Sequence, residues 1–242
     1  MKYLLVAMIL SGAAAASEYQ GALFNMMAPV EGISRGDFEI SVNHRFFGEA
    51  FDDSPLESFF GMDESANVAF GIRYFPMENA YLSYENGISA HSHAIELGWV
   101  ESALEPVLIE FNAGYCTFRT GTPSDGDWDG GMTGTIGAST RLFRNMIRPV
   151  VNYAFDGYRE EGGPGIGLEF YAMEYMSLWG EYFVATDDAA ENDCFSFGSR
   201  YSTWGHQFIL ALTNNPWIGP QGQIMGTPTN DVHVGFQIRR MF

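Results

Sequence analysis

Apolar and polar residues alternate along most of this chain from about residue 38 onward. In residues 38–46, apolar side chains or a histidine occupy the even positions, whereas Glu39, Ser41, Asn43 and Arg45 occupy the odd positions. Side chains of a β-strand point alternately to its two faces. This period of two therefore predicts strands with one apolar and one polar face.

We expect twelve such strands, most of them close to the roughly 9–11 residues that a tilted strand needs to cross a membrane. Their predicted ranges are 37–47, 65–75, 80–88, 93–101, 107–118, 132–143, 147–156, 164–173, 176–186, 194–203, 205–214 and 231–242.

The connections between these strands also alternate. The even-numbered connections are tight turns, such as the "PMEN" and "SALEP" stretches. The odd-numbered connections are 48–64, 89–92, 119–131, 157–163, 187–193 and 215–230, and all but 89–92 are long. An even number of strands with short turns at one end and long loops at the other is typical of outer-membrane barrels. We therefore expect an all-β fold, namely a 12-stranded antiparallel transmembrane β-barrel with up-and-down meander order.

The start of the chain has the features of a secretory signal peptide in the usual order. Lys2 precedes an apolar run over residues 3–10, and small residues follow up to Ala16. A buried apolar strand is the other interpretation of this run. We expect residues 1–16 to be a signal peptide, residues 17–35 a periplasmic N-terminal tail, and residues 36–242 a barrel in the outer membrane of a Gram-negative bacterium.

The last predicted strand ends on Phe242, and Val234, Phe236 and Ile238 share its face. This pattern resembles the C-terminal aromatic signal by which bacterial barrel-assembly machinery recognises its substrates, although Arg240 interrupts the apolar face. We expect that machinery as a partner through Phe242, together with outer-membrane lipid and lipopolysaccharide.

The net charge is strongly negative, at −18, and this excludes nucleic acid as a partner because the phosphates would be repelled. The inward faces of the predicted strands are nevertheless balanced, with as many arginines as glutamates, so the excess lies in loops and turns. The inward ionic residues, which are the predicted lining of the lumen, are Glu39, Arg45, Arg73, Glu85, Glu96, Glu110, Arg141, Arg148, Glu169, Glu181, Arg200 and Arg239. A strongly charge-selective channel would show one sign in excess. Small inward residues, such as Gly71, Gly167 and Gly235, leave room for a narrow path.

One loop carries a possible metal site. Asp125, Asp127 and Asp129 precede Gly130 with the spacing of the first half of a calcium-binding loop. The closing carboxylate of such a loop is missing, since Ile136 stands in its place. A partial Ca²⁺ site and a solvated acidic loop are both possible interpretations, and we expect no other cofactor.

Catalysis is a less favoured reading. Some outer-membrane barrels hydrolyse lipids with serine and histidine side chains on the outer wall, and His44 and Ser92 supply these residue types. Histidine at a bilayer rim is also an ordinary interfacial residue. We expect no enzymatic activity, and we expect Cys116 and Cys194 to be separate rather than joined.

Two short motifs carry a family resemblance. His44, Arg45, Phe46 and Gly48 form an HRFG-like strand end with one inserted Phe, and Phe59, Phe60, Gly61 and Asp63 form an FFGLD-like stretch with Met62 in place of Leu. The sequence resembles a family of uncharacterised bacterial outer-membrane β-barrels over residues 36–87. The resemblance implies a barrel domain of unknown function and supplies no ligand or catalytic residue.

Three functions remain open for such a barrel. The first is a narrow, weakly selective channel for small solutes, because twelve strands lie between the filled barrels of eight strands and the open ones of 16–18. The second is a closed structural or surface-binding barrel whose acidic outer loops bind divalent cations. An outer-membrane lipid hydrolase is the third and most distant alternative.

Overall fold

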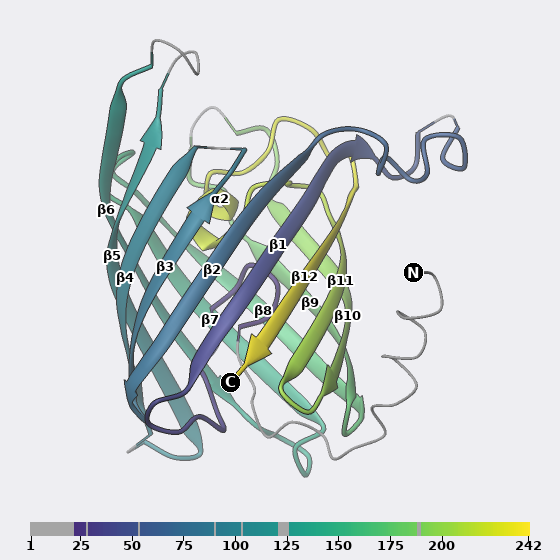
Figure 1. Cartoon of the computed structure of the whole chain (residues 1–242). Helices are drawn as coiled ribbons and strands as arrows, with labels where there is room; N and C mark the ends of the chain where they lie inside the picture. Colours follow the sequence, from purple (N-terminus) through teal and green to yellow (C-terminus); the bar gives the residue numbers. More distant parts are fainter. Residues whose placement is uncertain are drawn as a thin grey trace.

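The computed structural model describes residues 22–27, 29–52, 54–89, 91–102, 104–120, 126–187 and 190–242. The predicted signal peptide therefore lies outside the described residues. The strands form one closed barrel in which neighbours in sequence pair antiparallel and β12 closes on β1 (Figure 1). The predicted fold class and meander order are confirmed.

The strands match the predicted ranges closely. They are β1 (Phe38–Glu49), β2 (Ala66–Met77), β3 (Ala80–Gly87), β4 (Ser92–Glu101), β5 (Val107–Arg119), β6 (Trp128–Thr140), β7 (Ile147–Asp156), β8 (Glu161–Met173), β9 (Met176–Phe183), β10 (Cys194–Thr203), β11 (His206–Thr213) and β12 (His233–Met241), and a short helix α2 (Pro220–Ile224) precedes the last.

Two loops are shorter than the sequence indicates. β6 begins at Trp128 and β8 at Glu161, because Asp129 pairs with Phe118 and Gly162 pairs with Phe155 across the sheet. These added residues do not alternate in hydropathy, so the pattern alone ends the strands too early. They are paired instead with residues of the neighbouring strands β5 and β7.

The outward face of the barrel is apolar. In β2, for example, Phe70 and Ile72 are 46% and 52% exposed, whereas their neighbour Ala69 is buried. Exposed aliphatic and aromatic side chains at alternate positions of nearly every strand form a surface that suits lipid rather than water. The predicted alternation of outward apolar and inward polar residues is thus present in three dimensions.

Among the described residues, no helix has both the length and the apolar character needed to span a bilayer.

The N-terminal segment, defined here as the described residues 22–27 and 29–35, differs most from expectation. The sequence analysis assigned residues 17–35 to a periplasmic tail. In the structure the part of the segment up to Val30 runs inside the barrel (Figure 1), whereas Gly32, Ser34 and Arg35 are exposed. Leu23 and Met26 are fully buried against the wall. The physical reason is that its apolar side chains find a matching apolar patch on the inner face of the barrel.

Candidate functional site in the barrel lumen

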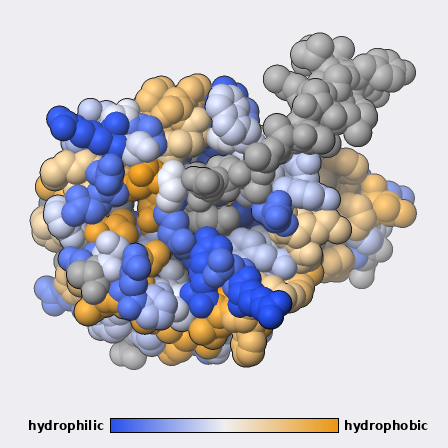
Figure 2. Space-filling view, turned by 90° about the horizontal axis from the view of Figure 1, so that it is seen from below, coloured by the Kyte–Doolittle hydropathy of each residue, from blue (hydrophilic) through white to orange (hydrophobic). Residues whose placement is uncertain are grey.

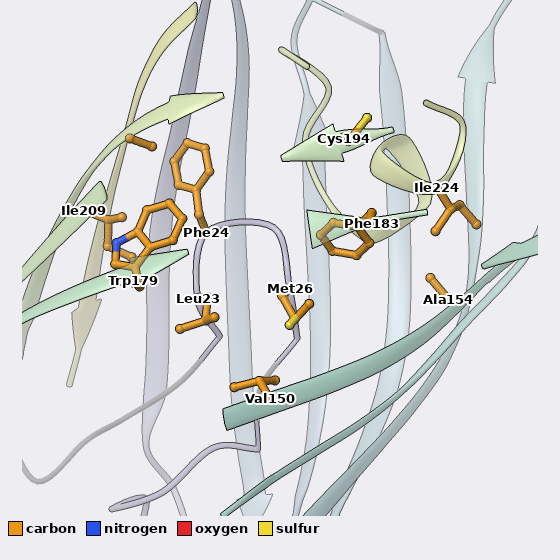
Figure 3. Close-up of a cluster of buried hydrophobic side chains, with 11 residues drawn as sticks. Leu23, Phe24, Met26, Val150, Ala154, Trp179, Phe183, Cys194, Ile209 and Ile224 are labelled. Atoms are coloured by element: carbon orange, nitrogen blue, oxygen red, sulfur yellow. The ribbon is translucent and has the colours of Figure 1, made fainter. Parts of the chain in front are cut away.

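The apolar patch occupies one half of the lumen. Phe24 stacks on Trp179 with 5.3 Å between ring centroids, and Leu23, Met26 and Phe183 belong to the same buried cluster. Figure 3 shows these side chains meeting between the N-terminal segment and the inner wall, with Ile209 beside Trp179 and Ile224 of α2 on the far side. Burial of this area anchors the segment through the hydrophobic effect.

Wall carboxylates accept hydrogen bonds from the backbone of the segment. The amides of Asn25 and Met26 donate to Glu181 at 2.9 and 3.1 Å, and the amide of Val30 donates to Glu110 at 3.2 Å. A segment without secondary structure would otherwise leave these buried amides unsatisfied, which is costly. Two of the predicted lumen glutamates therefore act as acceptors for this segment.

Arginines of the barrel wall also bind the segment, because they donate hydrogen bonds to its backbone carbonyls. Arg239 donates to the carbonyls of residues 22 and 23 at 2.7 and 2.9 Å, and Arg200 donates to residue 22 at 2.7 Å. Arg148 donates to the carbonyl of Pro29 at 2.9 Å. These hydrogen bonds from charged groups are stronger than neutral ones, so the segment is held along its length.

An ionic cluster lies under the segment. Glu169 forms ion pairs with Arg200 at 3.1 Å and with Arg148 at 3.4 Å, and all three side chains are at most 2% exposed. Ser177 and Tyr171 donate to the same carboxylate at 2.6 and 2.9 Å. Glu169 is thereby the shared partner of two buried cations.

Inward glycines make room for the segment. A Cβ atom added at Gly167 would lie 2.8 Å from both Leu23 Cδ1 and Met26 Sδ, and one at Gly235 would lie 2.8 Å from Phe24 Cζ. One at Gly137 would lie 2.9 Å from the carbonyl oxygen of Met27. Gly167 and Gly235, which the sequence indicates as free space, and Gly137 thus face the segment at contact distance.

A second apolar cluster lies near the turn end of the barrel, meaning the end with the short turns. Val30 packs with Phe75, Tyr81 and Val100, and the hydroxyl of Tyr81 donates to Glu110 at 2.6 Å. Figure 2 looks onto this end, where hydrophilic side chains gather over much of the middle and hydrophobic ones lie at several places on the rim. The later part of the segment therefore narrows the lumen here.

The other half of the lumen contains a cavity of about 810 Å³. It is bordered by the inner faces of β1 to β6 and β12, by the end of β7 and the β7–β8 connection, by the N-terminal segment and by the chain around α2 from Trp217 to Gly226. At the loop end, which carries the odd-numbered connections, Ser89 and His91 line it, and Glu39 and Arg73 line it nearer the turn end. The cavity thus extends along much of the barrel axis.

The twelve predicted lumen residues all face inward and fall into two groups. One group contacts the segment or the ionic cluster, with Arg141 joined to Glu31 of the segment at 3.1 Å. Its other members are Arg45, Glu110, Arg148, Glu169, Glu181, Arg200 and Arg239. The second group borders the cavity and comprises Glu39, Arg73, Glu85 and Glu96. Arg239 also borders it.

The predicted calcium loop is only partly a loop. Asp125 lies outside the described residues, and Asp129 belongs to β6, where its side chain accepts a hydrogen bond from the Gly130 amide. Within the described part of the chain, no group of three or more His, Cys, Asp or Glu side chains could hold a metal ion. A Ca²⁺ site at Asp127 stays a prediction.

The two family-motif stretches meet at the loop end. A Cβ atom at Gly48 would lie 2.7 Å from Gly61 Cα, so the two backbones touch where only glycine fits. Phe59, Phe60 and Gly61 all have positive φ, which bends the second stretch back toward β1. These residues therefore shape the β1–β2 connection, while Asp63 is exposed.

His44, the histidine of the hydrolase hypothesis, and His93, which follows Ser92, both contact aromatic rings. His44 stacks on Phe236 at 4.8 Å, and His93 forms a 2.9 Å hydrogen bond with the Tyr84 hydroxyl and lies 5.4 Å from the Trp128 ring. Such groups are typical of the aromatic belts at a membrane surface. Both cysteines are free, as predicted.

Sequence reasoning missed the inward aromatic residues and the residues of the segment that pack on them. Trp179 and Phe183 have the same parity as Ser177 and Glu181 in β9, so their position on the inward face was readable. The apolar run from Ala22 to Val30, directly after the predicted signal peptide, was the other available signal.

Comparison with known proteins supports the membrane-barrel resemblance. Residues 140–242 match a family model described as "Membrane bound beta barrel domain (DUF5777)". The matched residues lie outside the 36–87 stretch on which the sequence resemblance was based. No curated protein matches the sequence.

Several solved structures are similar to this one. The NanC porin has a TM-score of 0.50 and 8% identity, covering 84% of this chain and 98% of that one. Omp33 of Acinetobacter baumannii has a TM-score of 0.47 and 8% identity, covering 86% and 99%. A triple mutant of the Rhodopseudomonas blastica porin has a TM-score of 0.39 and 14% identity, covering 96% and 69%. At such identities the likeness concerns the fold alone, and the family match adds that the matched domain is a membrane-bound β-barrel.

Proposed function

We propose that this protein is a narrow outer-membrane channel for small polar solutes, with the path in the half of the lumen that the N-terminal segment leaves free. The observation that carries the proposal is the cavity of about 810 Å³ inside a closed barrel wall. Its lining mixes carboxylate, guanidinium, amide and hydroxyl groups, which suits hydrated solutes rather than apolar ones.

One observation favours a closed barrel as the second candidate. The backbone of the N-terminal segment donates hydrogen bonds to the Glu181 carboxylate and accepts them from the Arg239 guanidinium group. If the segment never moves, the barrel would act as a structural or surface-binding protein, and its acidic outer loops, Asp127 included, would be the sites for divalent cations. A lipid hydrolase finds less support, since His44 and His93 are engaged with aromatic partners.

Planar-bilayer recording of the folded, full-length protein distinguishes the two candidates. We expect small stepwise currents in 1 M KCl, because half of the lumen is filled and the remaining path is narrow. Stepwise currents as large as those of an unobstructed wide pore would contradict the half-filled lumen. Complete absence of steps would favour the closed barrel.

A further inference from the structure

The charged residues of the lumen are divided unevenly between its two halves. Arg148 and Arg200 lie in the filled half, where they pair with Glu169, and Arg239 binds carbonyls of the segment. Along β1 to β4, the wall of the cavity instead carries Glu39, Glu85 and Glu96 with Arg73. The other ionic residues that border the cavity are Asp156, Arg119, Arg159 and Arg239, so carboxylates outnumber guanidinium groups only along β1 to β4.

Glu85 and Glu96 lie next to each other on the inner face. Ala94 is the direct cross-strand partner of Glu85, and Glu96 follows two positions later on β4, so the two glutamates are diagonal neighbours. The Asn43 amide donates to Oε2 of Glu85 at 3.3 Å. Ser83 and Asn112 donate to Oε2 of Glu96 at 3.3 and 3.5 Å.

Two amide oxygens beside these carboxylates have no hydrogen-bond donor among the described residues. Asn43 is only 3% exposed, and its Oδ1 atom is buried without a partner, as is Oδ1 of Asn112. Both side chains border the cavity. Because an unsatisfied buried acceptor is costly, this arrangement suits a ligand that donates hydrogen bonds.

The nearby guanidinium groups are directed elsewhere. Arg45 stacks over the Phe24 ring at 3.2 Å and donates to Asn25 Oδ1 at 3.4 Å. Arg73 lies over the Tyr81 ring at 4.4 Å. Within the described residues, neither Glu85 nor Glu96 forms a salt bridge. The carboxylate pair therefore has no cation in direct contact.

We propose that Asn43, Glu85, Glu96 and Asn112 form a binding site for small organic cations that carry an ammonium group. An ammonium group has three N–H donors and a positive charge, which match amide oxygens and carboxylates. Among the described residues, no group of three or more His, Cys, Asp or Glu side chains could hold a metal ion, and this site contributes only two carboxylates. The proposal adds a solute class to the proposed channel function. Binding of the cation does not require an open channel, but the effect of the site on ion selectivity rests on the proposed function.

Calorimetric titration of the detergent-folded, full-length protein with 1,4-diaminobutane tests the site directly. We expect saturable binding of the diamine and none of the neutral 1,4-butanediol. Glu85→Gln and Glu96→Gln preserve shape while removing one charge, so each is expected to weaken diamine binding at least about tenfold. Glu191→Gln removes the same charge from an exposed outer loop and is expected to leave binding unchanged. No diamine binding, or equal weakening in Glu191→Gln, would overturn the proposal.

Reversal potentials across a KCl gradient separate this proposal from the channel itself. Cation preference in the natural protein that falls in Glu85→Gln and Glu96→Gln supports the site. If the natural protein conducts without cation preference, the channel function is supported and the cation-binding site is refuted. If the protein binds the diamine but carries no current, the cation-binding site is supported and the channel function is refuted.

Discussion

Deletion of residues 22–35 is expected to raise the single-channel conductance of the folded barrel several-fold. These residues fill the half of the lumen lined by Trp179 and Phe183, and they narrow the turn end through Val30. Removing them joins that volume to the existing cavity and leaves an unobstructed barrel of twelve strands, whose bore lies between the filled and the open classes. Planar-bilayer recording of both proteins in the same salt measures the effect.

A point substitution tests the same claim without deleting the segment. Glu181→Ala removes the acceptor of the Asn25 and Met26 amides without shortening the chain. We expect it to loosen the segment, so that brief large openings interrupt the small steady current. Conductance that is the same in the natural protein, the deletion and Glu181→Ala would show that the segment does not obstruct the path.

Replacement of Glu169 by Gln is expected to lower the free energy of unfolding by about 3–5 kcal/mol, the usual cost of removing one partner from a buried ionic group. Glu169 is fully buried between Arg148 and Arg200, and it also accepts hydrogen bonds from Ser177 and Tyr171. A neutral glutamine removes the carboxylate that pairs with Arg200 and leaves Arg148 with its longer, 4.0 Å ion pair to Glu31.

Guanidinium unfolding of the detergent-folded protein measures this loss. Glu160→Gln makes the same chemical change at an exposed position and is expected to alter stability by no more than about 0.5 kcal/mol. Equal stability of Glu169→Gln and Glu160→Gln would mean that the carboxylate does not balance the two arginines.

The strands of the barrel wall could be predicted because the two environments of each strand determine its own sequence pattern. In a strand such as β2, lipid on one side and a polar lumen on the other impose a period of two that survives in the sequence, and the turn lengths add the meander order. The strand starts at Trp128 and Glu161 were missed because Gly130, Gly131, Gly162 and Gly163 carry no hydropathy signal.

The filling of the lumen could not be predicted by the same reasoning. An inward position of a barrel can face water, a side chain or another segment, and the alternation is the same in each case. Trp179 and Phe183 broke the expected polarity of the inner face, and the run from Ala22 to Val30 was apolar without a strand period. Each observation alone is ambiguous, and only the fold brings the two together.

Site-directed cross-linking tests the location of the N-terminal segment most directly. In a background with Cys116→Ser and Cys194→Ser, the pair Asn25→Cys and Ser196→Cys places two thiols where the Asn25 amide now lies 3.3 Å from the Ser196 hydroxyl. The pair Asn25→Cys and Phe197→Cys is the control, because Phe197 is the next residue and points outward. We predict that mild oxidation of the membrane-embedded protein joins the first pair and not the second. Failure to join the first pair, or equal joining of both, would contradict a segment lodged inside the barrel.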